Sequence, residues 1–193
     1  MVVAVQELPT PVRDAYHRAA ATAFAYSSEV LAGRLLATLS AAVPAGGRIL
    51  ELGTGVGTGL AWIVHGLAGR GDVRVVSIER DEQTARIAAG AVWPAGFDLR
   101  VGDAEQLLPA LGAFDLIFAD APGGKWTGLD RTVAALAPGG VLLLDDMDEQ
   151  RYPAEHHGVL HGIRSALTGD PELATTELPV GSGLILAARR RPL

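Results

Sequence analysis

A short apolar run, an acidic residue and four closely spaced glycines follow one another in residues 48–63, which read Arg-Ile-Leu-Glu-Leu-Gly-Thr-Gly-Val-Gly-Thr-Gly-Leu-Ala-Trp-Ile. The glycines stand at alternating positions from Gly53 to Gly59, and a helical pattern follows them. This order is typical of a strand that turns sharply into a helix. Glycine leaves the main chain open to a ligand, and the helix directs its free N–H groups and positive dipole end to the same place. The first hypothesis is therefore that a nucleotide-like ligand binds in this turn.

The spacing of these glycines separates two classes of ligand. A dinucleotide fingerprint, Gly-x-Gly-x-x-Gly, that starts at Gly53 requires glycine where the chain has Thr58. Glu51, Gly53, Gly55 and Gly57 instead resemble the Glu/Asp-x-Gly-x-Gly-x-Gly motif of Rossmann-like S-adenosylmethionine-dependent methyltransferases. A carboxylate at the mouth of the turn would repel phosphate, whereas S-adenosylmethionine carries an ammonium and a sulfonium and no phosphate. The acid therefore favours S-adenosylmethionine, and the alternative is a glycine-rich turn without a ligand.

Length and composition limit the partners of the chain. Its 193 residues, 49% of them hydrophobic, predict one domain over 1–193, with a helical prelude at 1–46 and a cofactor-binding core at 47–193. The net charge of −6 gives no electrostatic reason to expect nucleic acid or an anionic membrane as a partner. Without cysteine, neither disulfides nor thiolate metal sites can form. We expect a cytoplasmic protein that binds a small-molecule acceptor, either as a monomer or as a homodimer.

Strand-like and helix-like segments alternate from residue 48 onward. The apolar runs are at 49–52, 73–78, 97–101, 114–119 and 141–144, and the helical patterns are at 58–68, 82–91, 104–111, 127–136 and 156–167. Near-continuous apolar strands are typical of a parallel sheet covered by helices on both faces. Two further runs, 173–178 and 183–188, are too close together for a crossover helix and predict an antiparallel hairpin. The predicted fold is α/β, a Rossmann-like doubly wound, mostly parallel seven-stranded sheet that ends in this hairpin.

The residues before this core have a helical pattern of their own. Apolar residues recur at three- and four-residue spacing over 11–42, with an interruption at 26–29. Ser27 or Ser28 is expected to cap the second of the two helices, because a serine side chain can accept a hydrogen bond from a free N–H of the first turn. The prelude is therefore predicted to be two helices.

Acidic residues follow each of the five predicted parallel strands. In an open α/β sheet, ligands bind beyond the carboxyl ends of the strands, so these acids are candidates for the site. Glu79 ends the second strand, about twenty residues beyond the glycine turn, where an acid that binds ribose hydroxyls is expected. Asp103 follows the third strand, and it can cap the next helix, contact adenine, or do both. The fourth and fifth strands end in Asp120 and in the pair Asp145 and Asp146.

Four stretches resemble the small-molecule O-methyltransferases of the catechol and caffeoyl-coenzyme A type. They are Tyr-Ser-Ser-Glu at 26–29, Phe-Asp-Leu-Ile-Phe-Ala-Asp at 114–120, Pro-Gly-Gly-Val-Leu-Leu-Leu-Asp-Asp at 138–146 and Leu-Pro-Val-Gly-Ser-Gly-Leu at 178–184, and the resemblance covers nearly the whole chain. It implies that S-adenosylmethionine contacts Ser28, Glu51, Gly53, Thr54, Gly55, Gly57, Thr58, Glu79, Arg80, Gly102, Asp103, Ala104 and Asp120.

The same resemblance implies a magnesium site. In that family the residues that match Asp120, Asp145 and Asp146 bind Mg²⁺, which holds adjacent hydroxyls of the substrate. Mg²⁺ prefers oxygen ligands, and a metal-bound hydroxyl loses its proton more readily. We expect Asp120, Lys125 and Asp146 to carry the catalysis. The chain departs from the family at Lys125, which follows Asp120 by five residues instead of three, with a flexible insertion between them. Three roles therefore stay open for Lys125: a base, a group that positions the substrate, and a cover for the next helix. Whether the reaction needs a metal ion also stays open.

Histidine and aromatic residues give weaker signals. His157 and His161 stand one helical turn apart, but glycine replaces the glutamate of the zinc-protease motif between them and no third ligand is evident, so a solvated helix face is favoured. Whether a histidine reaches the site and acts as a base stays open. Trp126 and Tyr152 are expected to line the acceptor pocket, whereas Trp62 is expected in the core.

Three alternatives to an O-methyltransferase remain at this point. An N-methyltransferase is disfavoured because the sequence Asp-Ala-Pro-Gly after the fourth strand lacks the aromatic residue of that class. An NAD-binding oxidoreductase is disfavoured by Thr58. A catalytically silent binding or dimerisation protein would keep the same ligand pocket, so the motifs do not separate it from an enzyme.

Overall fold

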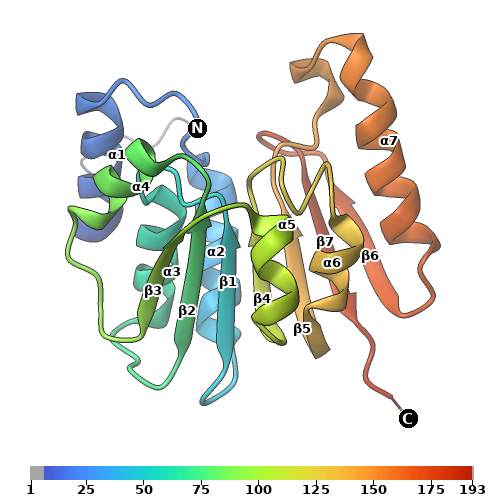
Figure 1. Ribbon diagram of the computed structural model, residues 1–193, viewed down its shortest axis with the longest axis horizontal. Coiled ribbons are helices and arrows are strands. Elements are labelled where there is room, and N and C mark those ends of the chain that lie inside the picture. The colour runs from blue at the N-terminus through green and yellow to red at the C-terminus, as the bar shows by residue number, and fades with distance from the viewer. Residues whose placement is uncertain (1–6, 193) are drawn as a thin grey trace.

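The structure, a computed structural model, describes residues 7–192. Its centre is a seven-stranded sheet in the order β3-β2-β1-β4-β5-β7-β6 (Figure 1). The strands are β1 (Arg48–Leu52), β2 (Arg74–Glu79), β3 (Phe97–Val101), β4 (Phe114–Ala119), β5 (Leu136–Leu144), β6 (Leu173–Leu178) and β7 (Leu184–Arg189). Pairs among β1 to β5 are parallel, whereas β7 pairs antiparallel with both β5 and β6. The predicted mostly parallel sheet with a terminal antiparallel hairpin is confirmed.

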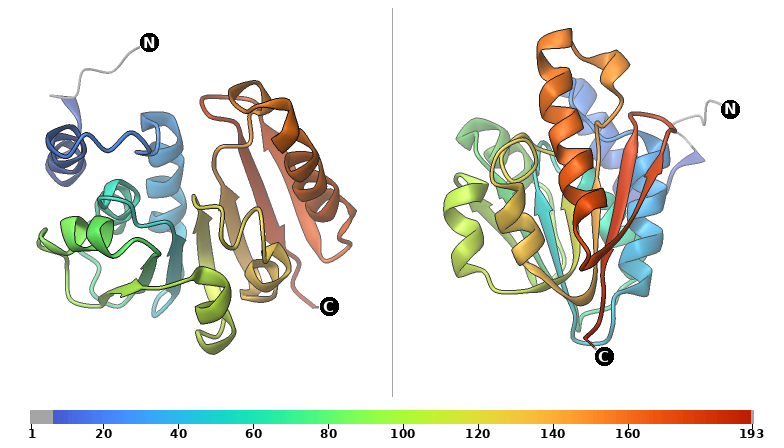
Figure 2. Two further views of the ribbon diagram at one scale, coloured as in Figure 1. Left: turned by 45° about the horizontal axis from the view of Figure 1, so that its top comes forward. Right: turned by 90° about the vertical axis from the view of Figure 1, so that its right-hand side faces the viewer.

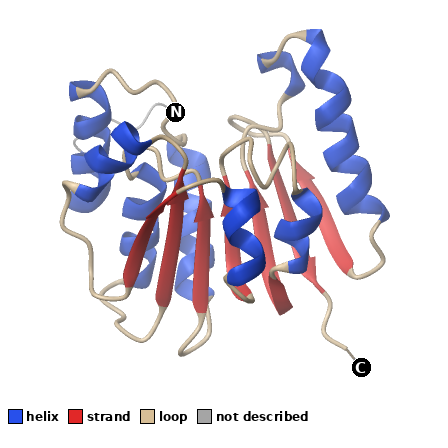
Figure 3. Cartoon of the chain, in the orientation of Figure 1, coloured by secondary structure: helices blue, strands red, loops and turns tan. Residues whose placement is uncertain are grey.

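Helices cover both faces of this sheet (Figures 2 and 3). One face is covered by α2 (Val30–Ala42) and α3 (Thr58–Leu67), with α1 (Thr10–Ala21) packed on α3, and the other by α5 (Ala104–Leu107), η2 (Leu108–Ala110), α6 (Leu129–Ala134) and α7 (Ala154–Gly169). The helix α4 (Glu82–Ala89) contacts β2 and β3, and the short helix η3 (Glu149–Arg151) follows β5. Within residues 7–192, no helix is long and apolar enough to cross a membrane.

The alternation of side chains along β1 shows how the two layers form. Ile49 belongs to the hydrophobic cluster that includes residues of α1, α2 and α3, whereas Leu50 and Leu52 belong to the cluster on the opposite face. Successive residues of a strand point to opposite faces, so a strand buried on both sides must be apolar throughout. Glu51 is the exception in this strand, and its fully buried carboxyl lies next to the glycine turn.

Two predicted boundaries are wrong around β5. The strand starts at Leu136 and not at residue 141, and α6 ends at Ala134, before the end of the predicted helix. The reason is the Pro-Gly-Gly segment at 138–140, which reads as a turn in the sequence but continues the strand through a register shift relative to β4. Leu136 pairs with Phe114, so the apolar residue that we assigned to the helix belongs to the sheet.

The predicted serine cap of α2 is also wrong. Glu29 is the N-cap residue, and no side chain of the cap accepts a hydrogen bond from the first turn. The hydroxyl of Ser28 instead donates to Oδ2 of Asp120 at 2.9 Å. The residue type that suggested a local cap therefore forms a long-range contact with the end of β4.

Candidate active site

The carboxyl ends of β1, β2, β4 and β5 meet at one edge of the sheet, toward the top of Figure 1. A cavity of about 590 Å³ opens there. It is lined by Phe24, Tyr26, Ser27, Ser28, Gly53, Thr54, Gly55, Val56, Thr58, Gly59, Glu79, Arg80, Asp81, Thr84, Asp120, Ala121, Pro122, Lys125, Trp126, Asp146 and Tyr152. One cavity thus contains residues of the glycine turn and residues that the sequence assigned to catalysis.

The glycine turn between β1 and α3 requires its first glycine. Gly53 has a φ of 98°, a value that side-chain-bearing residues rarely adopt. A Cβ atom at this position would lie 2.6 Å from the carbonyl oxygen of Asp120. The turn therefore packs directly against the end of β4, and this close approach joins the two halves of the cavity wall.

Glu51 lies beneath the turn and not at its mouth. Its side chain is fully buried, Ser77 donates a hydrogen bond to Oε2, and Oε1 has no hydrogen-bond partner among the described residues. Burial raises the pKa of Glu51 well above its ordinary value, which favours the protonated form. The expectation that a charged Glu51 at the mouth of the turn repels phosphate is therefore wrong.

Glu79 lines the cavity at the end of β2. Its Oε2 accepts a hydrogen bond of 2.9 Å from the N–H of Gly55, and Oε1 accepts one of 2.9 Å from the N–H of Asp81. These two contacts fix the carboxylate between the glycine turn and the start of α4. A carboxylate accepts more than two hydrogen bonds, so the fixed oxygens can still accept ligand hydroxyls.

Asp103 is the N-cap of α5, where its Oδ1 accepts from the N–H of Glu105 at 2.8 Å. The capping role is confirmed. Gly102, Asp103 and Ala104 do not line the main cavity, although Asp103 and Ala104 lie next to Gly123 in the loop after β4. Their contact with adenine stays a prediction.

Three acidic residues and a lysine meet at the ends of β4 and β5. Burial, followed by the charge of Asp145, raises the pKa of Asp120 well above its ordinary range, while the charge of Lys125 acts in the opposite direction. Burial also raises the pKa of Asp145. Asp145 is 1% exposed, and its Oδ1 accepts from the Ser182 hydroxyl and, at 2.7 Å, from the N–H of Asp146. Of this acidic pair, Asp146 is the member that lines the cavity.

Lys125 is buried, with 2% of its side chain surface exposed. Its Nζ donates a hydrogen bond of 2.8 Å to the backbone oxygen of Asp145. The prediction of a flexible insertion before Lys125 is wrong, because Pro122 accepts hydrogen bonds from the N–H groups of Lys125 and Trp126, at 3.2 and 2.7 Å. The hydrogen bond directs the ammonium group to the end of β5, and which of the expected roles Lys125 has stays a prediction.

Aromatic side chains form the wall beside these acids. The ring centroids of Trp126 and Tyr152 are 5.3 Å apart, and that of His156 lies 5.0 Å from Trp126. Trp126 and Tyr152 line the cavity as predicted, whereas neither His156 nor His157 does. Burial raises the pKa of Tyr152 to about 12, so its phenol stays neutral at physiological pH.

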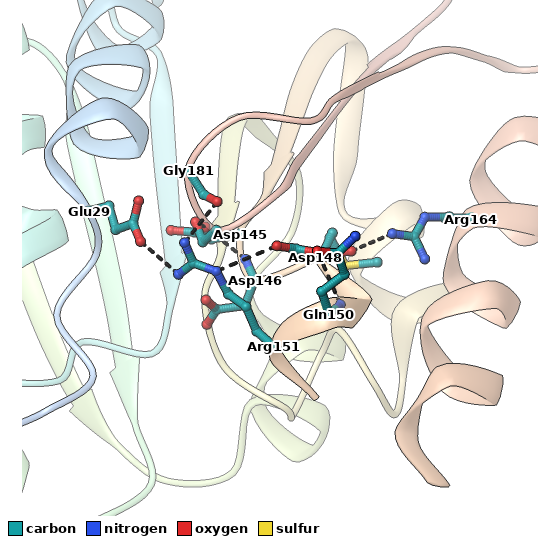
Figure 4. Close-up of polar contacts among 10 residues, drawn as sticks. Glu29, Asp145, Asp146, Asp148, Gln150, Arg151, Arg164 and Gly181 are labelled. Atoms are coloured by element: carbon teal, nitrogen blue, oxygen red, sulfur yellow. Dashed lines mark hydrogen bonds and ion pairs between the residues drawn. The ribbon is translucent and has the colours of Figure 1, made fainter. Parts of the chain in front are cut away.

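Several residues that shape the site gave no signal in the sequence. Arg18 in α1 donates from Nε to the Val56 carbonyl of the glycine turn at 2.7 Å, and the ring of Phe24 packs against the same turn at Gly55. Arg151 in η3 pairs with Glu29 at 2.7 Å and donates to the Gly181 carbonyl at 2.9 Å (Figure 4). All of these contacts join segments far apart in the chain, and local spacing carries no information about such pairs.

Several known proteins of similar sequence and structure are named methyltransferases. A family described as "Methyltransferase domain" matches residues 50–147, just over half of the 193 residues. A protein from Mycobacteroides abscessus named "Putative O-methyltransferase" is 25% identical over 166 residues, which is 80% of this chain and 77% of that protein. A structure titled as a putative O-methyltransferase from Klebsiella pneumoniae is 26% identical, with a TM-score of 0.80 over 95% of this chain and 91% of that one.

The O-methyltransferase TomG from Streptomyces achromogenes, solved in complex with S-adenosylmethionine, has the same fold. Its TM-score is 0.81 over 95% of this chain and 91% of TomG, at 24% sequence identity. The fold of the seven-stranded sheet and the matched segment from β1 to the end of β5 agree with this group of proteins. The chain belongs to the methyltransferase domain family and is a class I S-adenosylmethionine-dependent methyltransferase.

Proposed function

We propose that this chain transfers the methyl group of S-adenosylmethionine to a hydroxyl group of a small molecule. The observation that carries the proposal is the single cavity in which the glycine turn and Glu79 face Asp120, Lys125 and Asp146. A methyl donor held at the turn and an acceptor held at the carboxylates would share one cavity. The similarity to O-methyltransferases supports oxygen as the atom that receives the methyl group.

The residues at the turn suit S-adenosylmethionine. Glu79 presents fixed carboxylate oxygens that can accept hydrogen bonds from ribose hydroxyls, and the start of α3 offers unpaired N–H groups to the cofactor carboxylate. Ser28, Thr54, Thr58 and Arg80 complete the polar lining. When bound, the cofactor supplies an electrophilic methyl group on a sulfonium centre. We propose that Gly102, Asp103 and Ala104 border the adenine.

The acceptor end of the cavity combines aromatic walls with carboxylates. Trp126 and Tyr152 can enclose a flat small molecule and exclude water from the reacting atoms. We assign to Asp146 the role of accepting the proton of the acceptor hydroxyl, because its carboxylate lines the cavity. The acceptor oxygen gains the methyl group as the carbon–sulfur bond of the cofactor breaks, and the neutral sulfide leaves. Positioning and proton transfer are the contributions of the protein.

The acidic residues do not fit the magnesium site that the resemblance implies. Within residues 7–192, no three acidic, histidine or cysteine side chains are arranged to hold a metal ion. One oxygen of Asp145 already accepts two hydrogen bonds, and the ammonium group of Lys125 binds to the backbone of the same residue. Mg²⁺ takes oxygen ligands in near-octahedral geometry, and the carboxylates that hold it must be arranged to match that geometry. We therefore assign no catalytic step to a metal.

Methyl transfer can be measured directly with S-adenosylmethionine labelled on its methyl group. The acceptor panel should contain catechols, monophenols and aliphatic alcohols, and the label should appear in at least one product. Asp146→Asn should lower kcat by about 100-fold or more, as expected for loss of a general base. The matched control is Asp130→Asn, which changes an exposed aspartate of α6 outside the cavity.

The outcome also separates the alternatives. Label transfer to amines and not to hydroxyls would show that nitrogen, and not oxygen, is the acceptor atom. Tight binding of cofactor without transfer to any compound of a metabolite extract would indicate a catalytically silent protein. Unchanged turnover of Asp146→Asn would refute the assignment of the base while leaving the reaction in place.

A further inference from the structure

We infer that the ammonium group of Lys125 is the built-in cation of the acceptor site and takes the place of a divalent metal ion. The inference rests on the proposed function for the identity of the acceptor end. Lys125 is then a positioning residue that holds the acceptor oxygen while its proton moves to Asp146. The chain needs no metal ion at Asp120, Asp145 and Asp146.

The first observation is compositional. Of the 16 basic residues in the sequence, Lys125 is the only lysine, and all the others are arginines. A lysine ammonium is a compact point charge with three donors, whereas a guanidinium is a wide planar fork. The chain thus carries a lysine only at the place where the resemblance implies a small, hard cation.

The second observation is the rigid turn that directs Lys125 inward. Three successive N–H groups, those of Lys125, Trp126 and Thr127, donate to the carbonyl of Pro122 at 2.7 to 3.3 Å. Gly124 has a φ of 85°, and a Cβ atom there would lie 2.5 Å from Cδ1 of Leu52. The two extra residues before the lysine therefore form a closed turn that packs against β1. This turn fixes where the ammonium group lies.

The third observation is the polar environment of the ammonium group. A buried charge is costly unless it is hydrogen-bonded and balanced by opposite charge. The hydrogen bond to the Asp145 carbonyl uses one of the three N–H donors, and two remain for carboxylates or for the acceptor oxygen. Two of the acids assigned to the metal, Asp120 and Asp146, line the same cavity as Lys125.

A divalent ion held by Asp120 and Asp146 would share one cavity with this ammonium group. Like charges at a short distance in a buried site repel strongly, so an ion between the carboxylates would have to displace Lys125. The closed turn and the burial of the lysine, at 2% exposure, oppose that displacement. In the structure, the backbone oxygen of Asp145 holds the ammonium group in the cavity that Asp120 and Asp146 line.

The single lysine allows a direct test by nuclear magnetic resonance. Protein labelled with ¹³Cε-lysine gives one lysine signal, which belongs to Lys125. We record this signal in the complex with S-adenosylhomocysteine. Addition of Mg²⁺ to about 10 mM should leave its chemical shift unchanged, and addition of about 0.1 mM Mn²⁺ should leave its line width unchanged. Stoichiometric paramagnetic broadening by Mn²⁺ that Mg²⁺ reverses would overturn the inference, because it would place a metal beside Lys125.

A second measurement uses Lys125→Met, with titration of Mn²⁺ followed by calorimetry. The wild-type protein should bind no stoichiometric Mn²⁺, whereas Lys125→Met, with its acids unbalanced, should gain one Mn²⁺ per chain. Adding Asp146→Asn to this variant should weaken the new site at least about 10-fold. Failure of Lys125→Met to gain Mn²⁺ would contradict the claim that the lysine occupies the cation position. Thermal melts of both variants check that they fold.

Titration with S-adenosylhomocysteine keeps this test separate from the proposed function. If neither wild type nor variant binds S-adenosylhomocysteine, the proposed reaction fails, but the metal titrations still judge the role of Lys125. If the cofactor binds and a chelator leaves methyl transfer by the wild type unchanged, the proposed reaction and the inference about Lys125 both stand. If a chelator abolishes transfer and Mn²⁺ restores it, the reaction stands and the inference about Lys125 is wrong.

Discussion

The hydroxyl of Ser28 donates a hydrogen bond of 2.9 Å to Oδ2 of Asp120, across 92 positions of the chain. Ser28 lies between α1 and α2, and its carbonyl accepts from the hydroxyl of Tyr16 at 2.6 Å. Asp120 follows β4 and lines the cavity. The helical prelude is therefore joined by direct hydrogen bonds to the edge of the sheet where the reaction is proposed to occur.

Ser28→Ala removes this donor from Asp120. A hydrogen bond to a carboxyl group contributes about 1 to 3 kcal/mol, and Ser28 is only 7% exposed, so water cannot easily replace it. We expect the free energy of unfolding to fall by about 1 kcal/mol and kcat/KM to fall by about 10-fold. Urea unfolding and initial rates measure the two effects, with Ser165→Ala on the exposed face of α7 as control. Equal values for wild type and Ser28→Ala would show that the contact is irrelevant.

Glu79→Gln tests the ribose site. The amide keeps the shape of the side chain but replaces one fixed acceptor oxygen with a donor, so it cannot accept from both Gly55 and Asp81 and from a ribose hydroxyl. The Kd for S-adenosylhomocysteine should rise by about 10-fold to 100-fold. Glu82→Gln, an exposed residue of α4 outside the cavity, should leave it unchanged. Unaltered affinity of Glu79→Gln would remove Glu79 from the cofactor site.

Glu51→Gln should change how stability depends on pH. Burial raises the pKa of Glu51 well above 4.5, so the stabilisation linked to its proton is fully present below pH 4.5 and is lost as pH rises through the folded-state pKa. Glutamine does not ionise, so the variant loses no stability in this way as pH rises. The free energy of unfolding of the variant, relative to wild type, should therefore increase between pH 5 and pH 8 by more than about 1 kcal/mol. Urea unfolding at both values measures it, and a constant difference would contradict a raised pKa.

Arg151→Ala tests the contact between η3 and the helical prelude. Arg151 and Glu29 pair at 2.7 Å, with 44% and 41% of their side chains exposed, so the pair should contribute less than about 1 kcal/mol to global stability. We expect faster hydrogen exchange at the η3 amides and little change in melting temperature. Arg86→Ala, which breaks an exposed pair within α4, is the matched control. Unchanged exchange at η3 would show that the pair does not hold this segment.

Local patterns predicted the elements well, because strand and helix signals along β1, β3, β4 and β6 do not depend on distant residues. The ends of β3, β4 and β6 agree with the predicted runs to the residue. The prediction failed at the Pro-Gly-Gly segment of β5 because an irregular strand and a turn have the same local composition. The fold could be read from periodicity, but the boundary at β5 depended on pairing with β4.

The chemistry of the site was less accessible to sequence. Acids at strand ends correctly indicated the edge where the cavity lies, since topology alone brings parallel strand ends together. Their individual environments depend on burial, which placed Glu51 beneath the turn and Asp145 out of the cavity. The place of the Lys125 side chain depends on the turn closed by Pro122, a geometry that spacing along the chain does not reveal.

Calorimetric titration of the wild-type protein with S-adenosylmethionine, S-adenosylhomocysteine and NAD tests the central claim most directly. We predict one site per chain for each of the two sulfur-containing ligands, with Kd values of about 1 to 100 μM, and no heat of binding for NAD. Tight binding of NAD with no binding of S-adenosylmethionine or S-adenosylhomocysteine would contradict the account.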